Sequence, residues 1–300
     1  MATLICGSLA FDTIMDFEGR FADQILAEQL HILNVSFLVP TLRRDFGGCA
    51  GNIAYAMKQL GGEPLPMATV GTDAQGYLDR LRALGISTEF VRSLDDAYTA
   101  QAMIMTDRDN NQITAFHPGA MSAAHLNAVP GRPDIRLGII SPDGREAMLQ
   151  HAQQFHGAGV PFVFDPGQGL PTFSGEELRH FVELASWIAV NDYEGRMLSE
   201  RTGWSLAELS QRVRGLVVTL GAAGCDLWER GQSTHVAGVQ AVEVVDPTGC
   251  GDAWRGALLY GLEQGWSLAR CAELGNRLGA LKVAARGPQN YVWRGDGLTA

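Results

Sequence analysis

The sequence predicts an α/β protein with three layers, in which a doubly wound, mainly parallel sheet lies between two layers of helices. Two observations carry this prediction. Short apolar runs that end in polar or glycine residues alternate with helix-like segments, as expected for buried parallel strands and their crossover helices. Other segments, which mix charged, aromatic and β-branched residues, alternate only partly and predict a small β-sheet lid. The apolar runs span 3–8, 135–141, 160–165, 186–191 and 215–221.

The remaining segments complete this arrangement within a single domain over residues 1–300. Residues 52–60 have apolar side chains at helical spacing and are closed by two glycines. We expect an antiparallel hairpin over 225–238 and a long helical region near the C-terminus. The lid strands are expected at about 12–18, 31–46 and 98–118, and the turn-like sequence DRDNN divides the last of these segments.

Composition and charge exclude several classes of protein. The formal net charge is −10, so the chain lacks the basic excess that binding to nucleic acid or an anionic membrane requires. Its five cysteines are dispersed, without a C-x-x-C pair, which favours reduced thiols over disulfides or structural zinc. The N-terminus lacks the regions of a signal peptide, and no apolar run is long enough to span a membrane. We therefore expect a cytoplasmic enzyme.

Three common site motifs are absent. There is no G-x-x-x-x-G-K-[ST] sequence of a P-loop enzyme. The nearest match to a dinucleotide-binding fingerprint is GAAGCD at 221–226, but its glycine spacing is wrong and it opens a strand-like segment. The seven histidines include no H-E-x-x-H pair, so a zinc hydrolase is also disfavoured.

Polar and glycine residues gather at the carboxyl ends of the predicted strands. In an open parallel sheet, ligands bind beyond these ends. One polar strand end is unremarkable, whereas five that converge on one edge predict a binding site there. The five strand ends lie at 8–12, 165–167, 191–194, 219–224 and 246–252.

The sequence DPTGCGD at 246–252 has the properties that phosphoryl transfer requires. The migrating phosphoryl group spreads negative charge over its oxygens, and the protein has mainly to position and neutralise it. The backbone N–H groups of Gly249, Cys250 and Gly251, at the start of a helix, can provide that neutralisation. Asp252 beside them can accept the proton of an attacking hydroxyl, but an aspartate here can equally be a simple N-cap.

Two longer segments, DFGGCAGNIAYAMKQLGG (45–62) and VVDPTGCGDAWRGAL (244–258), resemble the signature regions of the ribokinase-like (PfkB) carbohydrate and nucleoside kinases. NDYE (191–194), TLGAAG (219–224) and GSLAFD (7–12) resemble further motifs of that family, in the same order along nearly the whole chain. The resemblance implies a ribokinase-like α/β core with a small β-sheet lid, ATP as the phosphoryl donor and Mg²⁺ as cofactor.

The resemblance also implies a role for each matching residue. Asp252 corresponds to the general base, and Gly249, Cys250 and Gly251 correspond to the anion hole. The residues that match the acceptor side are Asp12, which grips sugar hydroxyls, Gly47 and Gly48 at the lid hinge, and Asn52. The residues that match the nucleotide side are Asn191 and Glu194, which organise Mg²⁺ and its waters, and Thr219, Gly221, Gly224 and Asn276, which hold ATP. Asp246 and Thr248 match a monovalent-cation site, which implies K⁺.

Several of these residues also have a purely structural interpretation. Asn52 can cap its helix, and Glu194 can be a first-turn carboxylate that answers the helix dipole. Cys250 stands where the family more often has alanine. A small apolar filler is the favoured interpretation of this cysteine, although a thiol at a helix N-terminus can have a lowered pKa.

The acceptor is the least determined part of the prediction. Segments 30–48 and 112–121 look most similar to prokaryotic adenosine and other nucleoside kinases, so we expect a nucleoside 5′-kinase with adenosine as its leading acceptor. Candidates to stack on the base are Phe11, Phe37, Phe116 and His117, unless these rings form the core of the lid itself. The alternatives are a ribokinase- or fructokinase-type sugar kinase and a catalytically inactive nucleotide-binding protein on the same fold. The sequence leaves open a monomer or a homodimer formed through the lid.

Overall fold

The large sheet has nine strands within the described residues, in the order β13-β12-β11-β10-β9-β8-β1-β4-β5. The computed structural model describes residues 1–25, 32, 34–109 and 111–295. Neighbouring strands from β11 to β5 are parallel, and the β11–β12 and β12–β13 pairs are antiparallel. The predicted doubly wound, mainly parallel sheet is therefore confirmed. Its strands are β1 (Ala2–Cys6), β4 (Pro64–Val70), β5 (Val91–Ser93), β8 (Ile135–Ile140), β9 (Phe162–Phe164), β10 (Trp187–Asn191), β11 (Gly215–Thr219), β12 (Gly224–Glu229) and β13 (Gln232–Ala237).

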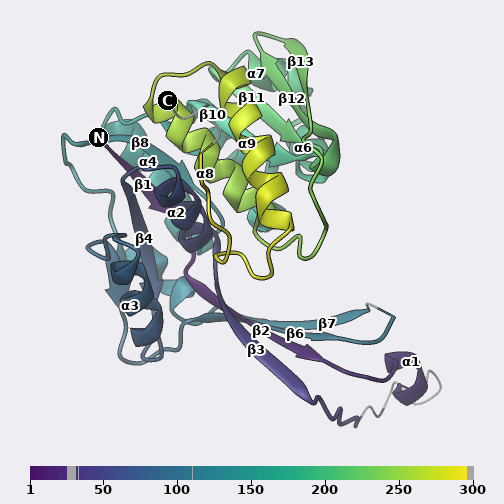
Figure 1. The fold of residues 1–300 in the computed structure, drawn as a ribbon. Helices are drawn as coiled ribbons and strands as arrows, with labels where there is room; N and C mark the ends of the chain where they lie inside the picture. The colour runs from purple at the N-terminus through teal and green to yellow at the C-terminus, as the bar shows by residue number, and fades with distance from the viewer. Residues whose placement is uncertain (26–31, 33, 110, 296–300) are drawn as a thin grey trace.

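Helices cover both faces of this sheet, and each face has its own apolar core (Figure 1). One core lies beneath α2 (Cys49–Gln59), α3 (Gln75–Ala83), α8 (Cys250–Glu263) and α9 (Leu268–Val283). The other lies beneath α4 (Arg145–Gly157), α5 (Gly175–Leu184) and α6 (Asp192–Thr202). The shorter helices are α1 (Phe21–Gln24), α7 (Leu206–Ser210) and three 3₁₀ segments, Gly119–Leu126, Gly167–Thr172 and Gly221–Ala223. None of the helices in the described residues has the length and apolar content that crossing a bilayer requires.

Strand β4 is a central strand that the sequence pattern does not predict. It contains Pro64 and Pro66, and proline is usually confined to strand edges because it has no N–H to donate. The register explains why both are tolerated. Thr3 and Gly7 of the β1 segment donate to the carbonyls of Glu63 and Met67, so residues 64 and 66 face the other side. On that side β5 pairs with β4 only from Ala68 onward. Within the part of the chain that the structure describes, no strand lies where it would need an N–H donor from Pro64 or Pro66, so the missing N–H groups cost no hydrogen bond of the sheet.

A second sheet of four strands, in the order β3-β2-β6-β7, extends away from the main body (Figure 1). Its strands are β2 (Ala10–Asp16), β3 (Thr41–Gly47), β6 (Ala100–Thr106) and β7 (Gln112–His117). The strand expected over 31–46 is shorter than predicted and begins only after Pro40. Residues 31 and 33 lie outside the described part of the chain. Phe37 instead packs its ring against Phe17 and Phe21, at centroid distances of 5.0 and 5.2 Å.

The register of the small sheet gives its two faces different chemistry. Asp12 lies opposite Asp45 on one side and Ala102 on the other, and Ala102 lies opposite Phe116. Directly opposed residues share a face of a sheet, so these four side chains form one row. The other face carries Met15, Leu42, Met103, Met105 and Ile113.

Candidate functional site

Asp252 lies in the first turn of α8, and the N-cap position of this helix is Gly249, whose φ of 79° is left-handed. The aspartate is therefore not the N-cap. Its carboxylate oxygen Oδ2 instead accepts a hydrogen bond of 2.8 Å from Nδ2 of Asn52 on α2. Burial raises the pKa of the Asp252 carboxyl to about 6, while the bond from Asn52 lowers it. A carboxylate with such a pKa is largely ionised at neutral pH and can accept a proton.

The loop before Asp252 presents backbone amides at the start of α8, as the motif predicts. The amide of Cys250 donates to the carbonyl of Pro247 at 3.2 Å, so this N–H has a partner within the loop. Burial raises the pKa of the Cys250 thiol above its ordinary value. This direction is opposite to that of an activated thiol, because burial and the nearby carboxylates of Asp246 and Asp252 outweigh the charge of Lys282.

Asp12 and Asp45 face this loop from the small sheet. Burial and the neighbouring carboxylates of Asp45 and Asp252 together raise the pKa of Asp12 to about 6. Gly47 leaves room for Asp12, because a Cβ atom on Gly47 would lie 2.4 Å from Oδ2 of that aspartate. The hinge glycines are followed directly by α2, whose N-cap position is Gly48. Asn52 is therefore inside the helix, and its interpretation as a cap is wrong.

A chain of hydrogen bonds runs from Asp252 to the hinge. Oδ1 of Asn52 accepts a bond of 3.0 Å from Nε2 of Gln289, and the same amide group donates to the hydroxyl of Tyr77 at 2.7 Å. Tyr77 in turn donates to the carbonyl of Gly47 at 2.6 Å. Gln289 and Tyr77 are both buried. These contacts link the orientation of the Asp252 carboxylate to the point where the small sheet joins α2.

Asn191 and Glu194 form a capping box at the start of α6, in which each side chain accepts the other's backbone N–H at 2.8 Å. The structural interpretation of Glu194 is thus confirmed. Oε2 of Glu194 also lies 3.8 Å from Nη2 of Arg255. A carboxylate has about four lone-pair sites, so Glu194 can still accept hydrogen bonds from water on a metal ion. It fits a water-mediated Mg²⁺ site better than a direct one, and the described residues contain no group of three or more His, Cys, Asp or Glu that could hold a metal.

Arg255 lies near both Glu194 and Asp252. It lies one turn after Asp252 on α8 and is buried with Asp165, to which it donates two hydrogen bonds of 3.0 Å. Burial raises the pKa of Asp165, whereas the guanidinium lowers it. A paired arginine and aspartate beneath the loop add little net charge to the site.

The residues expected around ATP fall into two groups. Thr219 ends β11 directly opposite Asn191, Gly221 begins the 3₁₀ turn that follows, and Gly224 is the first residue of β12. These three residues lie at the carboxyl edge of the sheet, as expected. Asn276 is buried and committed to the fold: Oδ1 accepts from the indole N–H of Trp254, and Nδ2 donates to the carbonyls of Val236 and Ala237. We therefore leave Asn276 out of the proposed site.

The pair expected to hold K⁺ has other partners. Both oxygens of the Asp246 carboxylate accept backbone N–H groups, from Thr248 and Gly287, each at 2.9 Å. Although burial raises it, these bonds hold the pKa of Asp246 below its ordinary value. The backbone carbonyl of Asp246 accepts a hydrogen bond of 2.8 Å from Nζ of Lys282. The residues present therefore do not fit a free cation at this carbonyl.

The four aromatic candidates for base stacking differ in burial and in their position relative to the small sheet. Phe11 is buried against Phe46 and Tyr77, and Phe37 packs in the aromatic cluster with Phe17 and Phe21. These two rings belong to apolar cores, so neither is a stacking candidate. Phe116 is 51% exposed and lies in the same row as Asp12. The neighbouring His117 is also exposed, but it lies on the opposite face of the small sheet.

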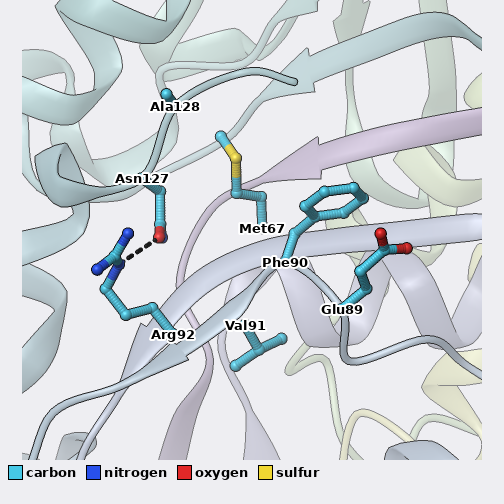
Figure 2. Close-up of a pocket in the computed structure, with 7 residues that line it drawn as sticks. All are labelled: Met67, Glu89, Phe90, Val91, Arg92, Asn127 and Ala128. Carbon is cyan, nitrogen blue, oxygen red and sulfur yellow. Dashed lines mark hydrogen bonds between the residues drawn. The ribbon is translucent and has the colours of Figure 1, made fainter. Parts of the chain in front are cut away.

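A cavity of about 330 Å³ lies elsewhere, against β4 and β5 (Figure 2). Arg92 crosses it and donates to Oδ1 of Asn127 at 3.0 Å. Asn127 also donates to the carbonyl of Ala68, so the polar groups here brace the strand edge. The cavity contains none of the predicted site residues.

Four residues at the site were not identified from the sequence: Tyr77, Arg255, Lys282 and Gln289. Arg255 and Lys282 carry a usable signal, because each is an isolated cation within an otherwise apolar helical segment. A buried charge of this kind requires a partner. Tyr77 and Gln289 carry no such signal, since their partners are far away in the sequence.

The chain is similar to known proteins over nearly its whole length. The chain is 31% identical over 262 residues to the nucleoside kinase of Methanocaldococcus jannaschii, which covers 86% of each protein. It is 55% identical to the Burkholderia thailandensis nucleoside kinase in a structure in complex with inosine, with a TM-score of 0.87 and coverage of 97% of this chain and 93% of that one. The structure of that kinase in complex with ADP-inosine gives 56% identity, a TM-score of 0.85 and coverage of 97% and 92%. A model of the pfkB family of carbohydrate kinases matches residues 15–294. The chain therefore belongs to the pfkB carbohydrate kinase family.

Proposed function

We propose that this protein is an ATP-dependent nucleoside 5′-kinase. One observation carries the proposal: the Asp252 carboxylate adjoins the amide loop at the start of α8 but is held by Asn52 of another helix. Because such a carboxylate does not cap its own helix, it can accept the proton of an incoming hydroxyl. Relatives that are nucleoside kinases by name support the same class of acceptor.

In the proposed reaction, Asp252 accepts the proton of the acceptor hydroxyl as its oxygen attacks the γ-phosphorus of ATP. The bond from that phosphorus to the bridging oxygen breaks, and ADP leaves. The amides of Gly249, Cys250 and Gly251 stabilise the charge on the phosphoryl oxygens, and the Cys250 amide gives up its bond to Pro247 for this purpose. Mg²⁺ would neutralise the phosphates of ATP, with Glu194 and Asn191 holding its waters.

The row of side chains on the small sheet supports a nucleoside over a simple sugar. In this proposal Asp12 binds the ribose hydroxyls, and Phe116 lies two strands away in the same row. Neighbouring strands are about 5 Å apart, so the two residues are separated by about 10 Å. This distance suits a ribose at Asp12 with its base reaching across Ala102 toward Phe116. Adenosine is the leading acceptor, and inosine is next because a relative has been solved with it.

We also propose that the small sheet closes over the acceptor and that its other face pairs with a second copy of the chain. Closure would exclude water and limit ATP hydrolysis. The face opposite Asp12 exposes Leu42, Met103 and Ile113, an apolar surface of the kind that isologous dimers bury. Light scattering of Ile113→Asp tests this: a dimer that becomes a monomer is expected. The five free cysteines fit the cytoplasmic location proposed for this enzyme.

The proposed function is tested by one competition assay of ATP consumption with adenosine, inosine, ribose and fructose. Phosphorylation of nucleosides in preference to both free sugars is expected. Preference for ribose or fructose would favour the sugar-kinase alternative, and no turnover with any acceptor would favour a nucleotide-binding protein. The variant Asp252→Asn should fold and bind adenosine but lose about 10²–10⁴-fold in kcat. Near-normal turnover would refute the role of Asp252 as general base.

A further inference from the structure

The chain has two lysines, Lys58 and Lys282, and the second is completely buried at the end of α9. Its ammonium group donates to the backbone carbonyl of Asp246 at 2.8 Å and to that of Ala285 at 3.0 Å. One of these carbonyls begins the loop that leads to Asp252, and the other lies in the turn after α9. A buried ammonium is costly unless such acceptors surround it, so this position is specific.

The two carbonyls bound by Lys282 are also the kind of group that binds a monovalent cation. Backbone carbonyls replace the hydration shell of K⁺ in proteins, and the Asp246–Thr248 segment is where the family resemblance implies such an ion. In this protein the ammonium group of Lys282 already donates a hydrogen bond to the Asp246 carbonyl and so occupies the position of such an ion. A second cation at the same oxygen would be strongly repelled at this distance.

We propose that Lys282 is a built-in cation that replaces a free monovalent ion, so that the enzyme works without K⁺. Lys282 is a positioning residue in this proposal: it ties the start of the 246–252 loop to the turn that follows α9. The Asp246 carboxylate strengthens the same junction by accepting the amides of Thr248 and Gly287. Two residues beyond Gly287, Gln289 binds Asn52, the partner of Asp252.

Other charges around Lys282 agree with a cation at this point. Burial lowers the pKa of Lys282 and Arg43 lowers it further, whereas the carboxylates of Asp246 and Asp45 favour the charged form. Arg43 lies on β3 with Nη2 3.6 Å from Oδ2 of Asp246, and it also pairs with Asp45 at 3.4 Å. The ammonium of Lys282 lies at the start of the 246–252 loop, and the N-terminus of α8 lies at the end of that loop. Both favour an anion beside the loop.

The test compares the wild-type protein and Lys282→Ala in potassium, sodium and choline chloride at equal ionic strength. For the wild type, kcat should vary by less than about twofold among the three salts, which differ little in general screening. Lys282→Ala in choline should lose about tenfold in kcat and about 5–10 °C in melting temperature. Potassium should recover part of both losses in this variant, because the shortened side chain leaves space beside the carbonyls. The matched control is Lys58→Ala, which removes a surface pair with Glu63 and should behave like the wild type.

Each outcome decides the proposal. A wild-type enzyme whose kcat rises by more than about twofold in potassium would overturn it. It would also fail if Lys282→Ala matched the wild type in choline, or if potassium recovered neither activity nor melting temperature. Should Lys282→Ala not fold, the salt series on the wild type still decides, and Lys282→Met, which fills the space without charge, should show the loss without recovery. The inference rests on the proposed kinase function for its activity readout, but the melting series needs no turnover and tests it separately.

Discussion

The side chain of Asn52 on α2 holds the carboxylate of Asp252 on α8 by a hydrogen bond of 2.8 Å, across 200 residues of sequence. Because Asn52 donates to the charged form of the carboxylate, the bond both orients the proposed base and favours its ionised state. Asn52 is itself fixed by Gln289. The geometry at Asp252 therefore depends on three separate parts of the chain.

The first prediction concerns pH. The pKa of Asp252 is about 6, and only the ionised carboxylate can accept a proton, so kcat should fall about tenfold per pH unit on the acid side of this value. Asn52→Leu removes the bond that lowers the pKa, so the acid limb should move to higher pH. Rate profiles of kcat at saturating acceptor measure both effects. An acid limb that stays in place in Asn52→Leu would show that Asn52 does not tune the base.

The second prediction concerns the hydrogen-bond chain. Gln289→Leu removes the amide that donates to Oδ1 of Asn52 and to the hydroxyl oxygen of Tyr77. Each side chain keeps its other bond, but two buried acceptors lose their donor, so the free energy of unfolding should fall by about 1–3 kcal/mol. Loss of orientation at Asp252 should also lower kcat by about tenfold. Combining it with Tyr77→Phe should cost less than the sum of the two, because the residues share one network. The matched control is Gln150→Leu, whose amide binds Glu146 at the surface.

The third prediction concerns the buried pair beneath the loop. Arg255→Met leaves Asp165 buried without its counter-charge, which should lower the free energy of unfolding by about 3–5 kcal/mol in urea titrations. The double variant Arg255→Met with Asp165→Leu should recover part of this loss, because no isolated charge remains. Arg132→Met removes surface pairs with Glu89 and Asp134 and should change stability little. An Arg255→Met variant as stable as the wild type would contradict this account.

The fourth prediction concerns the contact between the hinge and Asp12. In Gly47→Ala the new Cβ atom meets Oδ2 of Asp12 at 2.4 Å unless the aspartate moves. The acceptor KM should therefore rise by about tenfold or more, with a smaller effect on stability. Gly76→Ala is the control, since nothing lies within 4 Å of its Cβ position. Equal KM values in the two variants would argue that Asp12 does not bind the acceptor.

The fifth prediction concerns the base. Phe116→Ala should raise the KM for adenosine by about tenfold, because base–aromatic stacking contributes about 1–3 kcal/mol, and should leave the KM for ATP unchanged. Thr114→Ala, on the same strand and the same face, is the control and should leave both values unchanged. If Phe116→Ala binds adenosine normally, the base does not lie along this row of the small sheet.

The parts of the fold that could be predicted are those whose signal is local. The strands β1, β8, β10 and β11 are continuous apolar runs, and burial on both faces leaves little choice of structure. β4 was missed because Pro64 and Pro66 argue against a strand, and only its register next to the short β5 makes them acceptable. The strand expected over 31–46 was overextended, because alternation in sequence cannot show that Phe37 packs against Phe17.

The residues of the site likewise divide into those that the sequence indicates and those that it does not. Motif spacing predicts Asp252, Asn52 and Asp12 as site residues, because glycine-rich loops and strand ends are local features. The partners that set their chemistry come from distant segments and have no local signature: Gln289 lies 237 residues from Asn52. The competing interpretations of single residues also needed the packed structure. Burial decides the pKa of Cys250, and three internal hydrogen bonds engage the side chain of Asn276.

The two prolines of β4 have a further consequence for how the molecule behaves among other copies of itself. Upstream of Ala68 the outer border of β4 does not pair with β5, although Pro64 and Pro66 are buried in the folded protein. When such an unpaired border is exposed during folding, it is a template on which foreign chains can assemble. Pro64 and Pro66 place two ring nitrogens there instead of hydrogen-bond donors. This border should therefore resist strand addition, and substituting both prolines by valine should increase aggregation during refolding.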